Sequence, residues 1–170
     1  DKNNTPEVFQ GLVKKETSAV YTMLFLFFCM MLVLGMLSEG TYESGDSIQH
    51  FLISKYSFKH PELFLHHWGK PFFTLASSVF SQLGFIGIII FNIGCAVVTA
   101  WLGFRIAKRM QVANAWLISI FILFIPIYSV VIISGLTEIF FAFVLMSAIW
   151  LSVDRRFVFS AIAASFLPFV

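Results

Sequence analysis

The chain has 170 residues, of which 59% are hydrophobic, 22 are phenylalanine and only 12% are charged. This composition lies outside the range of soluble globular domains and indicates an integral membrane protein. The net charge of +2 gives no reason to expect a nucleic-acid partner.

The ends of the sequence indicate a piece of a longer protein. The first residue is Asp1 rather than methionine, and the last, Val170, lies inside an apolar run. We therefore expect residues 1–170 to be the N-terminal part of one transmembrane domain, with further C-terminal spans or a soluble domain beyond them.

Apolar runs alternate with polar connections along the chain. Crossing the hydrocarbon core of a bilayer takes about 20 residues, and residues 19–37 fit that length as a first span. The run 71–104 is too long for one span, so it predicts an interfacial helix over 71–83 and a span over about 85–104. Three more spans are expected at 113–134, where Pro126 should bend the outer end, at 135–153 and at 157–170. The expected fold is an all-α polytopic transmembrane bundle with short interfacial helices in its first outward loop, 38–70.

Basic residues are grouped on alternate connections, which sets the expected orientation. The basic residues concerned are Lys14, Lys15, Arg105, Lys108, Arg109, Arg155 and Arg156. They predict a cytoplasmic N-terminus, with the loop 38–70 and the turn 135–138 on the outward face. We expect the bacterial inner membrane, so that the outward face is the periplasm; in a eukaryote it would be the lumen of the endoplasmic reticulum.

The loop 38–70 concentrates the titratable side chains between two uncharged runs. It contains all four histidines, a cluster of carboxylates and three lysines. Its residues 47–58 place Ile48, Phe51, Leu52 and Tyr56 at helical spacing, a pattern typical of a helix lying in the membrane interface. A second short helix is expected from Pro61 to His67, ended by Gly69.

Asp46 is the leading catalytic candidate, because it follows the first span at the expected start of a helix. A carboxylate at the membrane surface can act as a general base. Asp46 followed by Gln49 is also a capping-box pattern, so Asp46 has a structural reading as well. His50 lies one helical turn later on the same face. Glu138, at the outer entry of the fourth span, is either a second site carboxylate in a shared wet cavity or an N-terminal residue favoured by the helix dipole.

The remaining polar residues allow lipid or metal binding. Lys55, Lys59 and Lys70 could hold a lipid phosphate, or they could extend to the headgroups without a ligand. Asp46 and Glu43 could bind a divalent cation, Mg²⁺ or Mn²⁺. The spacing of the histidines matches no metal motif, and adjacent His66 and His67 should point different ways on a helix, so solvated histidines are the favoured reading.

Three segments together resemble the N-terminal part of GT-C glycosyltransferases, a group that includes protein and GPI mannosyltransferases and the aminoarabinose transferase of lipid A. The segments are Gly45-Asp46-Ser47 with His50, the run from His66 to Pro71, and the run from Gly135 to Ala142, which is similar to a Thr-Glu-x-x-Phe element of GPI-type mannosyltransferases. The resemblance implies an acidic residue in the first outward loop and a sugar donated from a polyprenyl-phosphate carrier to an acceptor. It places the acidic role on Asp46, although Ser47 follows where the family often has a second acid.

Two other classes remain open from sequence alone. A transporter or channel fragment would place its functional polar groups within the spans, where this chain has few. A non-catalytic assembly protein would use the loop 38–70 structurally.

Overall fold

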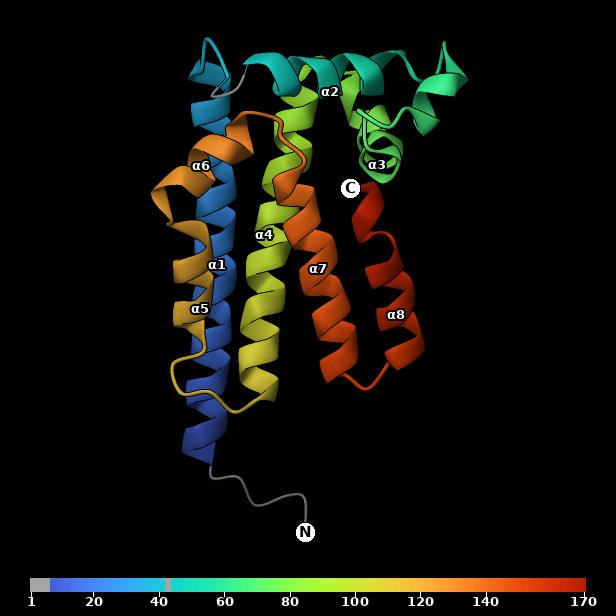
Figure 1. Ribbon diagram of the computed structural model, residues 1–170. Helices are drawn as coiled ribbons and strands as arrows, with labels where there is room; N and C mark the ends of the chain where they lie inside the picture. Colours follow the sequence, from blue (N-terminus) through green and yellow to red (C-terminus); the bar gives the residue numbers. More distant parts are fainter. Residues whose placement is uncertain (1–6, 42–43) are drawn as a thin grey trace.

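The computed structural model describes the backbone of residues 7–41 and 44–170, and the side chains of residues 16–41 and 45–170. Within these ranges all regular secondary structure is helical and there is no strand, which confirms the predicted all-α class (Figure 1). The helices in chain order are α1 Glu7–Leu37, α2 Ser44–Tyr56, the 3-10 helix η1 Pro61–Leu65, α3 Pro71–Ser81, α4 Phe85–Arg109, α5 Trp116–Leu123, α6 Pro126–Ile133, α7 Glu138–Val153, α8 Phe157–Ser165 and the 3-10 helix η2 Leu167–Phe169.

The long helices stand side by side, and α2 lies across one end of them (Figure 1). The helix α4 is central and packs against α1, α3, α5 and α7. The buried hydrophobic core follows these contacts, with Phe27 and Met31 from α1, Ile93 from α4 and Phe140 from α7 among its members. The turn between α6 and α7 lies at the same end as α2, whereas the α4–α5 and α7–α8 connections lie at the opposite end.

Two helices are long and apolar enough to cross a membrane. They are Glu16–Leu37 within α1 and the whole of α4, Phe85–Arg109. The 25 residues of α4 reach about 37 Å, more than the roughly 30 Å of a hydrocarbon core. These helices correspond to the first and second predicted spans, with the second extending five residues beyond the expected 104.

The third predicted span, 113–134, consists of two helices. The axes of α5 and α6 differ by 64°. The two helices are long and apolar enough to cross a membrane only if they are taken together as one broken span. The bend falls at the expected place because Pro126, the first residue of α6, has no backbone N–H to continue the hydrogen bonding of α5. The predicted spans 135–153 and 157–170 form α7, with 16 residues, and α8, with nine. Each is shorter than the length expected of a crossing helix.

The helix α2 packs against α3 through small polar side chains. The hydroxyls of Ser54 and Ser77 lie 2.9 Å apart, and Ser57 donates a hydrogen bond to the carbonyl of Ser54. Small side chains let the two helices approach closely, and the buried hydroxyls of Ser54, Ser57 and Ser77 each have a hydrogen-bond partner. The opposite side of α2 carries the predicted apolar stripe, of which Ile48, Leu52 and Tyr56 are exposed.

Candidate functional site

His50 is at the centre of a group of charged residues at the α2 end of the molecule. Its side chain is only 6% exposed, and its ring meets that of Phe73 edge-on at 5.8 Å. Burial lowers the pKa of His50 from the ordinary value of 6.5, while the carboxylates of Asp46 and Glu138 oppose this effect and Lys70 adds to it. His50 is therefore neutral at pH 7 and within electrostatic range of residues from three separate parts of the chain.

Asp46 lies in the first turn of α2, half-buried. The structure starts α2 at Ser44, two residues earlier than Asp46, so Asp46 is a first-turn residue and the interpretation of Asp46 and Gln49 as a capping box is wrong. Its negative charge still favours the N-terminal end of the helix dipole. One turn separates it from His50, as the sequence spacing predicts.

Lys70 reaches this group because of the glycine before it. Gly69 is buried under α2, where an added Cβ would lie 2.6 Å from Cγ2 of Ile53 and 2.9 Å from the hydroxyl of Thr74. That hydroxyl donates a 2.6 Å hydrogen bond to the carbonyl of Gly69. Gly69 thus permits a close approach rather than ending the second loop helix, which stops at Leu65. Lys70 follows at φ 55°, a strained conformation for a residue with a side chain, and strain of this kind is concentrated at functional sites.

Glu138 is the first residue of α7 and is exposed. The turn before it uses a positive φ of 71° at Gly135, a conformation that glycine adopts without strain. The side-chain amide of Asn92 in α4 donates a 2.9 Å hydrogen bond to the carbonyl of Leu136 in this turn. Asn92 is fully buried, so this bond fixes the start of α7 against the central helix.

Two polar atoms in this group lack a hydrogen-bond partner among the described residues. They are Nδ1 of His50 and the hydroxyl oxygen of Ser47, which is fully buried three residues earlier on α2. An unpaired buried polar atom costs free energy, and its presence calls for an explanation such as a bound ligand. Sequence reasoning named Ser47 only as part of the segment Gly45-Asp46-Ser47 and gave no role to Asn92, whose signal was a polar residue within an apolar helix.

The other histidines lie apart from His50 and are exposed. Nδ1 of His60 is 3.4 Å from the carboxylate of Glu62. His66 and His67 stack, with ring centroids 5.1 Å apart, so the expectation that they point different ways is wrong. The reason is that η1 ends at Leu65 and the backbone of His66 is extended.

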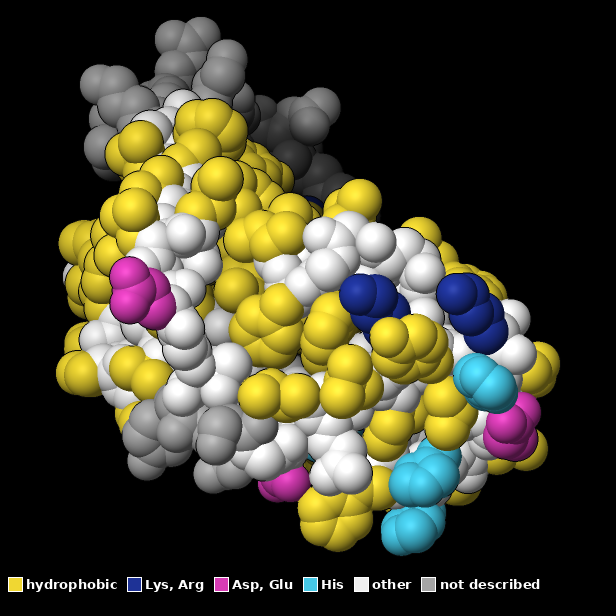
Figure 2. Space-filling view, turned by 90° about the horizontal axis from the view of Figure 1, so that it is seen from above, with side chains coloured by type: hydrophobic (Ala, Val, Ile, Leu, Met, Phe, Trp, Pro, Cys, Tyr) yellow, Lys and Arg dark blue, Asp and Glu magenta, His cyan; other side chains and the backbone are white. Residues whose placement is uncertain are grey.

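The three lysines of the loop lie in different places around α2. The charge of Lys70 helps to lower the pKa of His50. The ammonium of Lys55, in contrast, lies 5.3 Å from the ring centre of Phe51, on the opposite side of the helix. Lys59 is exposed beyond the end of α2. Seen from the α2 end, lysine and histidine side chains gather over α2 and η1, and hydrophobic side chains cover most of the remaining face (Figure 2).

The divalent cation expected from the sequence would need several side-chain ligands close together. Among them, no three or more His, Cys, Asp or Glu side chains lie close enough together to hold a metal ion. Asp46 contributes one carboxylate, and Glu43, its proposed partner, lies outside the described residues.

Comparison of the chain with protein-family models, with curated proteins and with solved structures finds no match. Function is therefore inferred from the residues and their arrangement. That arrangement combines a carboxylate suited to proton transfer, a neutral imidazole with an unpaired nitrogen, a second carboxylate and a cation.

Proposed function

We propose that the protein is an integral membrane glycosyltransferase of the GT-C type, which transfers a sugar from a polyprenyl-phosphate carrier to an acceptor on the outward face. The observation that carries the proposal is the buried, neutral His50 with its unpaired Nδ1, placed within electrostatic range of Asp46, Glu138 and Lys70. These residues come from the same three segments that resemble the family.

Membrane placement is supported by the candidate spans and by the aromatic residues at the end opposite α2. There the guanidinium of Arg105 lies 5.2 Å from the ring centre of Trp101 and 5.0 Å from that of Trp150. The indole N–H of Trp101 donates a 3.2 Å hydrogen bond to the hydroxyl of Tyr21. Trp, Tyr and Arg gather in this way at the boundary between hydrocarbon and water. We propose five spans, with the α5–α6 pair as one broken span and α7 and α8 as short ones.

In the proposed reaction, the oxygen of an acceptor hydroxyl attacks the anomeric carbon of the sugar. The carboxylate of Asp46 takes the proton of that hydroxyl as the new bond forms. The bond from that carbon to the phosphate oxygen breaks, and the polyprenyl phosphate leaves with the bonding electrons, so the configuration inverts. Lys70 offsets the negative charge of the phosphate. Neutral His50 and Glu138 hold sugar or acceptor hydroxyls, and the unpaired Nδ1 of His50 gains a partner from the substrate.

A transporter or channel is the second candidate, and the broken α5–α6 pair favours it. Transporters often bind their substrate at interrupted helices near the middle of the membrane. In α5 and α6, however, the residues on either side of the 64° bend include no Asp, Glu, Lys, Arg or His. The charged group instead lies at the α2 end, which favours chemistry at the membrane surface.

The decisive experiment replaces Asp46 in the full-length protein. Membranes containing Asp46→Asn should transfer radiolabelled sugar from a polyprenyl phosphate at least about a hundredfold more slowly than wild type, the lower range for loss of a general base. Asp46→Glu should keep part of the activity because it retains the carboxylate.

The matched control is Glu62→Gln, an exposed carboxylate in the same loop that lies outside the charged group. This variant should transfer at the wild-type rate. Wild-type membranes that show no transfer, or Asp46→Asn membranes that match wild type, would contradict the proposal.

A further inference from the structure

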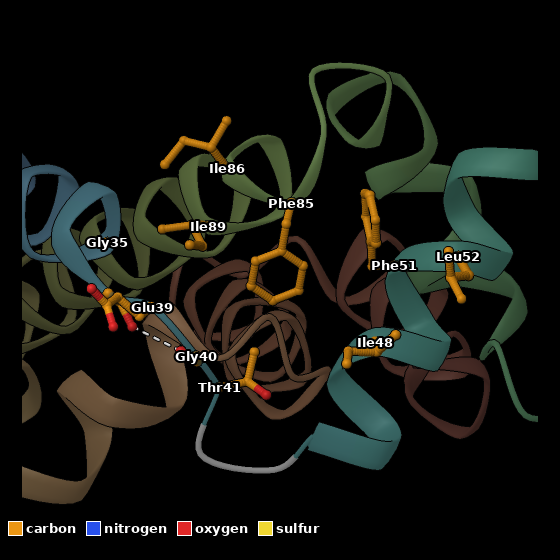
Figure 3. Close-up of a pocket in the computed structure, with 11 residues that line it drawn as sticks. Gly35, Glu39, Gly40, Thr41, Ile48, Phe51, Leu52, Phe85, Ile86 and Ile89 are labelled. Atoms are coloured by element: carbon orange, nitrogen blue, oxygen red, sulfur yellow. Dashed lines mark hydrogen bonds between the residues drawn. The ribbon is translucent and has the colours of Figure 1, made fainter.

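A second feature of this end of the molecule is a cavity of about 520 Å³ on the side of α2 that faces away from His50. It lies between the end of α1, the helix α2 and the start of α4 (Figure 3). Its size falls within the roughly 300–1,000 Å³ of small-molecule pockets. Hydrophobic side chains form most of its wall, including Ile48, Phe51, Phe85 and Ile89.

The helix α2 separates this cavity from the charged group around His50. Successive residues of an α-helix are rotated by about 100°, which puts Ile48 and His50 on roughly opposite sides of α2. The ring of Phe51 meets that of Phe85 edge-on at 5.5 Å and closes one wall. The cavity is therefore a different place from the proposed site of sugar transfer, and the apolar stripe predicted from the sequence lines it.

A carboxylate lines the cavity, and an ammonium lies near one of its walls. Glu39, exposed, lines the cavity on the α1 side, next to Ser38, whose hydroxyl donates a 2.8 Å hydrogen bond to the carbonyl of Gly40. Lys55 does not line the cavity, but its ammonium lies 5.3 Å from the ring centre of Phe51, which does. An apolar cavity with an anion at its rim and a cation beside its wall complements a molecule with a hydrocarbon chain and a zwitterionic head.

The surroundings of the cavity indicate how such a molecule would enter. Met36 and Leu37 at the end of α1 are 69% and 73% exposed, and Leu83 before α4 is 67% exposed. In a membrane these side chains contact lipid, so the cavity opens where acyl chains and headgroups meet.

We propose that this cavity binds a bilayer phospholipid with a primary-amine headgroup, such as phosphatidylethanolamine. One acyl chain lies among Ile48, Phe51 and Ile89, the phosphate lies near Lys55, and the ammonium lies near Glu39. The carboxylate of Glu39 disfavours an anionic headgroup such as phosphatidylglycerol. The inference depends on the proposed membrane location and is independent of sugar transfer.

The test measures lipid retention. The full-length protein is reconstituted in nanodiscs of equal parts phosphatidylethanolamine and phosphatidylglycerol. It is then released from the nanodiscs in the mass spectrometer, and native mass spectrometry identifies the lipid that stays bound. Wild type should retain phosphatidylethanolamine preferentially. Ile48→Trp and Leu52→Trp fill the cavity from exposed positions and should each lose the bound lipid.

A change of headgroup preference tests the role of Glu39. Glu39→Gln should weaken the preference for phosphatidylethanolamine roughly two- to fivefold, the size of one partly exposed ion pair. Glu39→Lys should shift the preference to phosphatidylglycerol.

Val79→Trp, at a position of α3 that is 65% exposed and outside the cavity, is the matched control and should retain lipid as wild type does. Equal retention of both lipids by wild type would overturn the proposal. Unchanged retention in folded Ile48→Trp and Leu52→Trp would also overturn it, since the lipid would then bind elsewhere on the surface.

Discussion

His50 combines strong burial with charged neighbours, and it is the residue on which pH should act most clearly. Its pKa in the folded protein is lower than the ordinary 6.5. Below that pH the unfolded chain binds a proton that the folded chain resists, so the free energy of unfolding should decrease as the pH falls through about 6.5.

This effect can be measured as a thermal midpoint between pH 7.5 and 5.5. Wild type should lose more stability over this range than His50→Gln, which has no group to protonate there. His60→Gln is the matched control, because it removes an exposed histidine of the same loop. Equal pH dependence of wild type and His50→Gln would show that His50 is not a buried neutral imidazole.

At the scale of the helices, the turn between α3 and α4 depends on close backbone contact. Gly87, in the first turn of α4, packs against the end of α3, and an added Cβ there would collide with the carbonyl oxygen of Phe80. Gly94, further along the same helix, has open space where a Cβ would be. The two glycines thus offer opposite outcomes from the same substitution.

Gly87→Ala should reduce the free energy of unfolding by about 1–3 kcal/mol, the range for inserting a carbon into a packed contact. Gly94→Ala should raise it by roughly 0.5–1 kcal/mol, because alanine favours the helix and meets no obstacle. Thermal unfolding of both variants in detergent checks this. A stable Gly87→Ala would mean that α3 and α4 do not pack as closely as the structure has them.

At the scale of the whole molecule, the two ends differ in chemistry. The end with α2 and η1 has all four histidines together with acidic residues and lysines, and the opposite end has Arg105, Lys108 and Arg155. At that second end the ammonium of Lys108 lies 2.8 Å from the carboxylate of Glu16, which ties α4 to α1. If the helices cross a membrane, these ends lie on opposite sides of it.

Cysteine labelling in intact cells tests this orientation. In a background with Cys29→Ser and Cys95→Ala, Glu62→Cys should react with a membrane-impermeant reagent, and Arg109→Cys should react only after the membrane is permeabilised. Both positions are exposed in the structure. Labelling of Arg109→Cys alone would reverse the orientation, and labelling of both would argue against a membrane between them.

Local pattern determined the helical class, the starts of α3, α4 and α8 and the bend at Pro126. These features follow from the chemistry of neighbouring residues: an apolar run long enough to cross a membrane, and a proline that cannot donate a hydrogen bond. The exact start of α2 and the stacking of His66 and His67 were mispredicted, because each depends on one or two backbone conformations that the apolar pattern does not specify.

Tertiary structure alone decided which polar residues lie together. The sequence suggested Asp46, His50, Glu138 and three lysines, but it gave no reason to separate Lys70, near His50, from Lys55, across α2. The position of Lys70 depends on Gly69 packing under Ile53, and that of Glu138 depends on Asn92 holding the carbonyl of Leu136. Both are contacts between segments far apart in the chain. The periodicity of a sequence indicates which face of a helix is apolar, but packing among the helices decides what each face contacts. The cavity beside Phe51 and the group around His50 therefore form only in the folded chain.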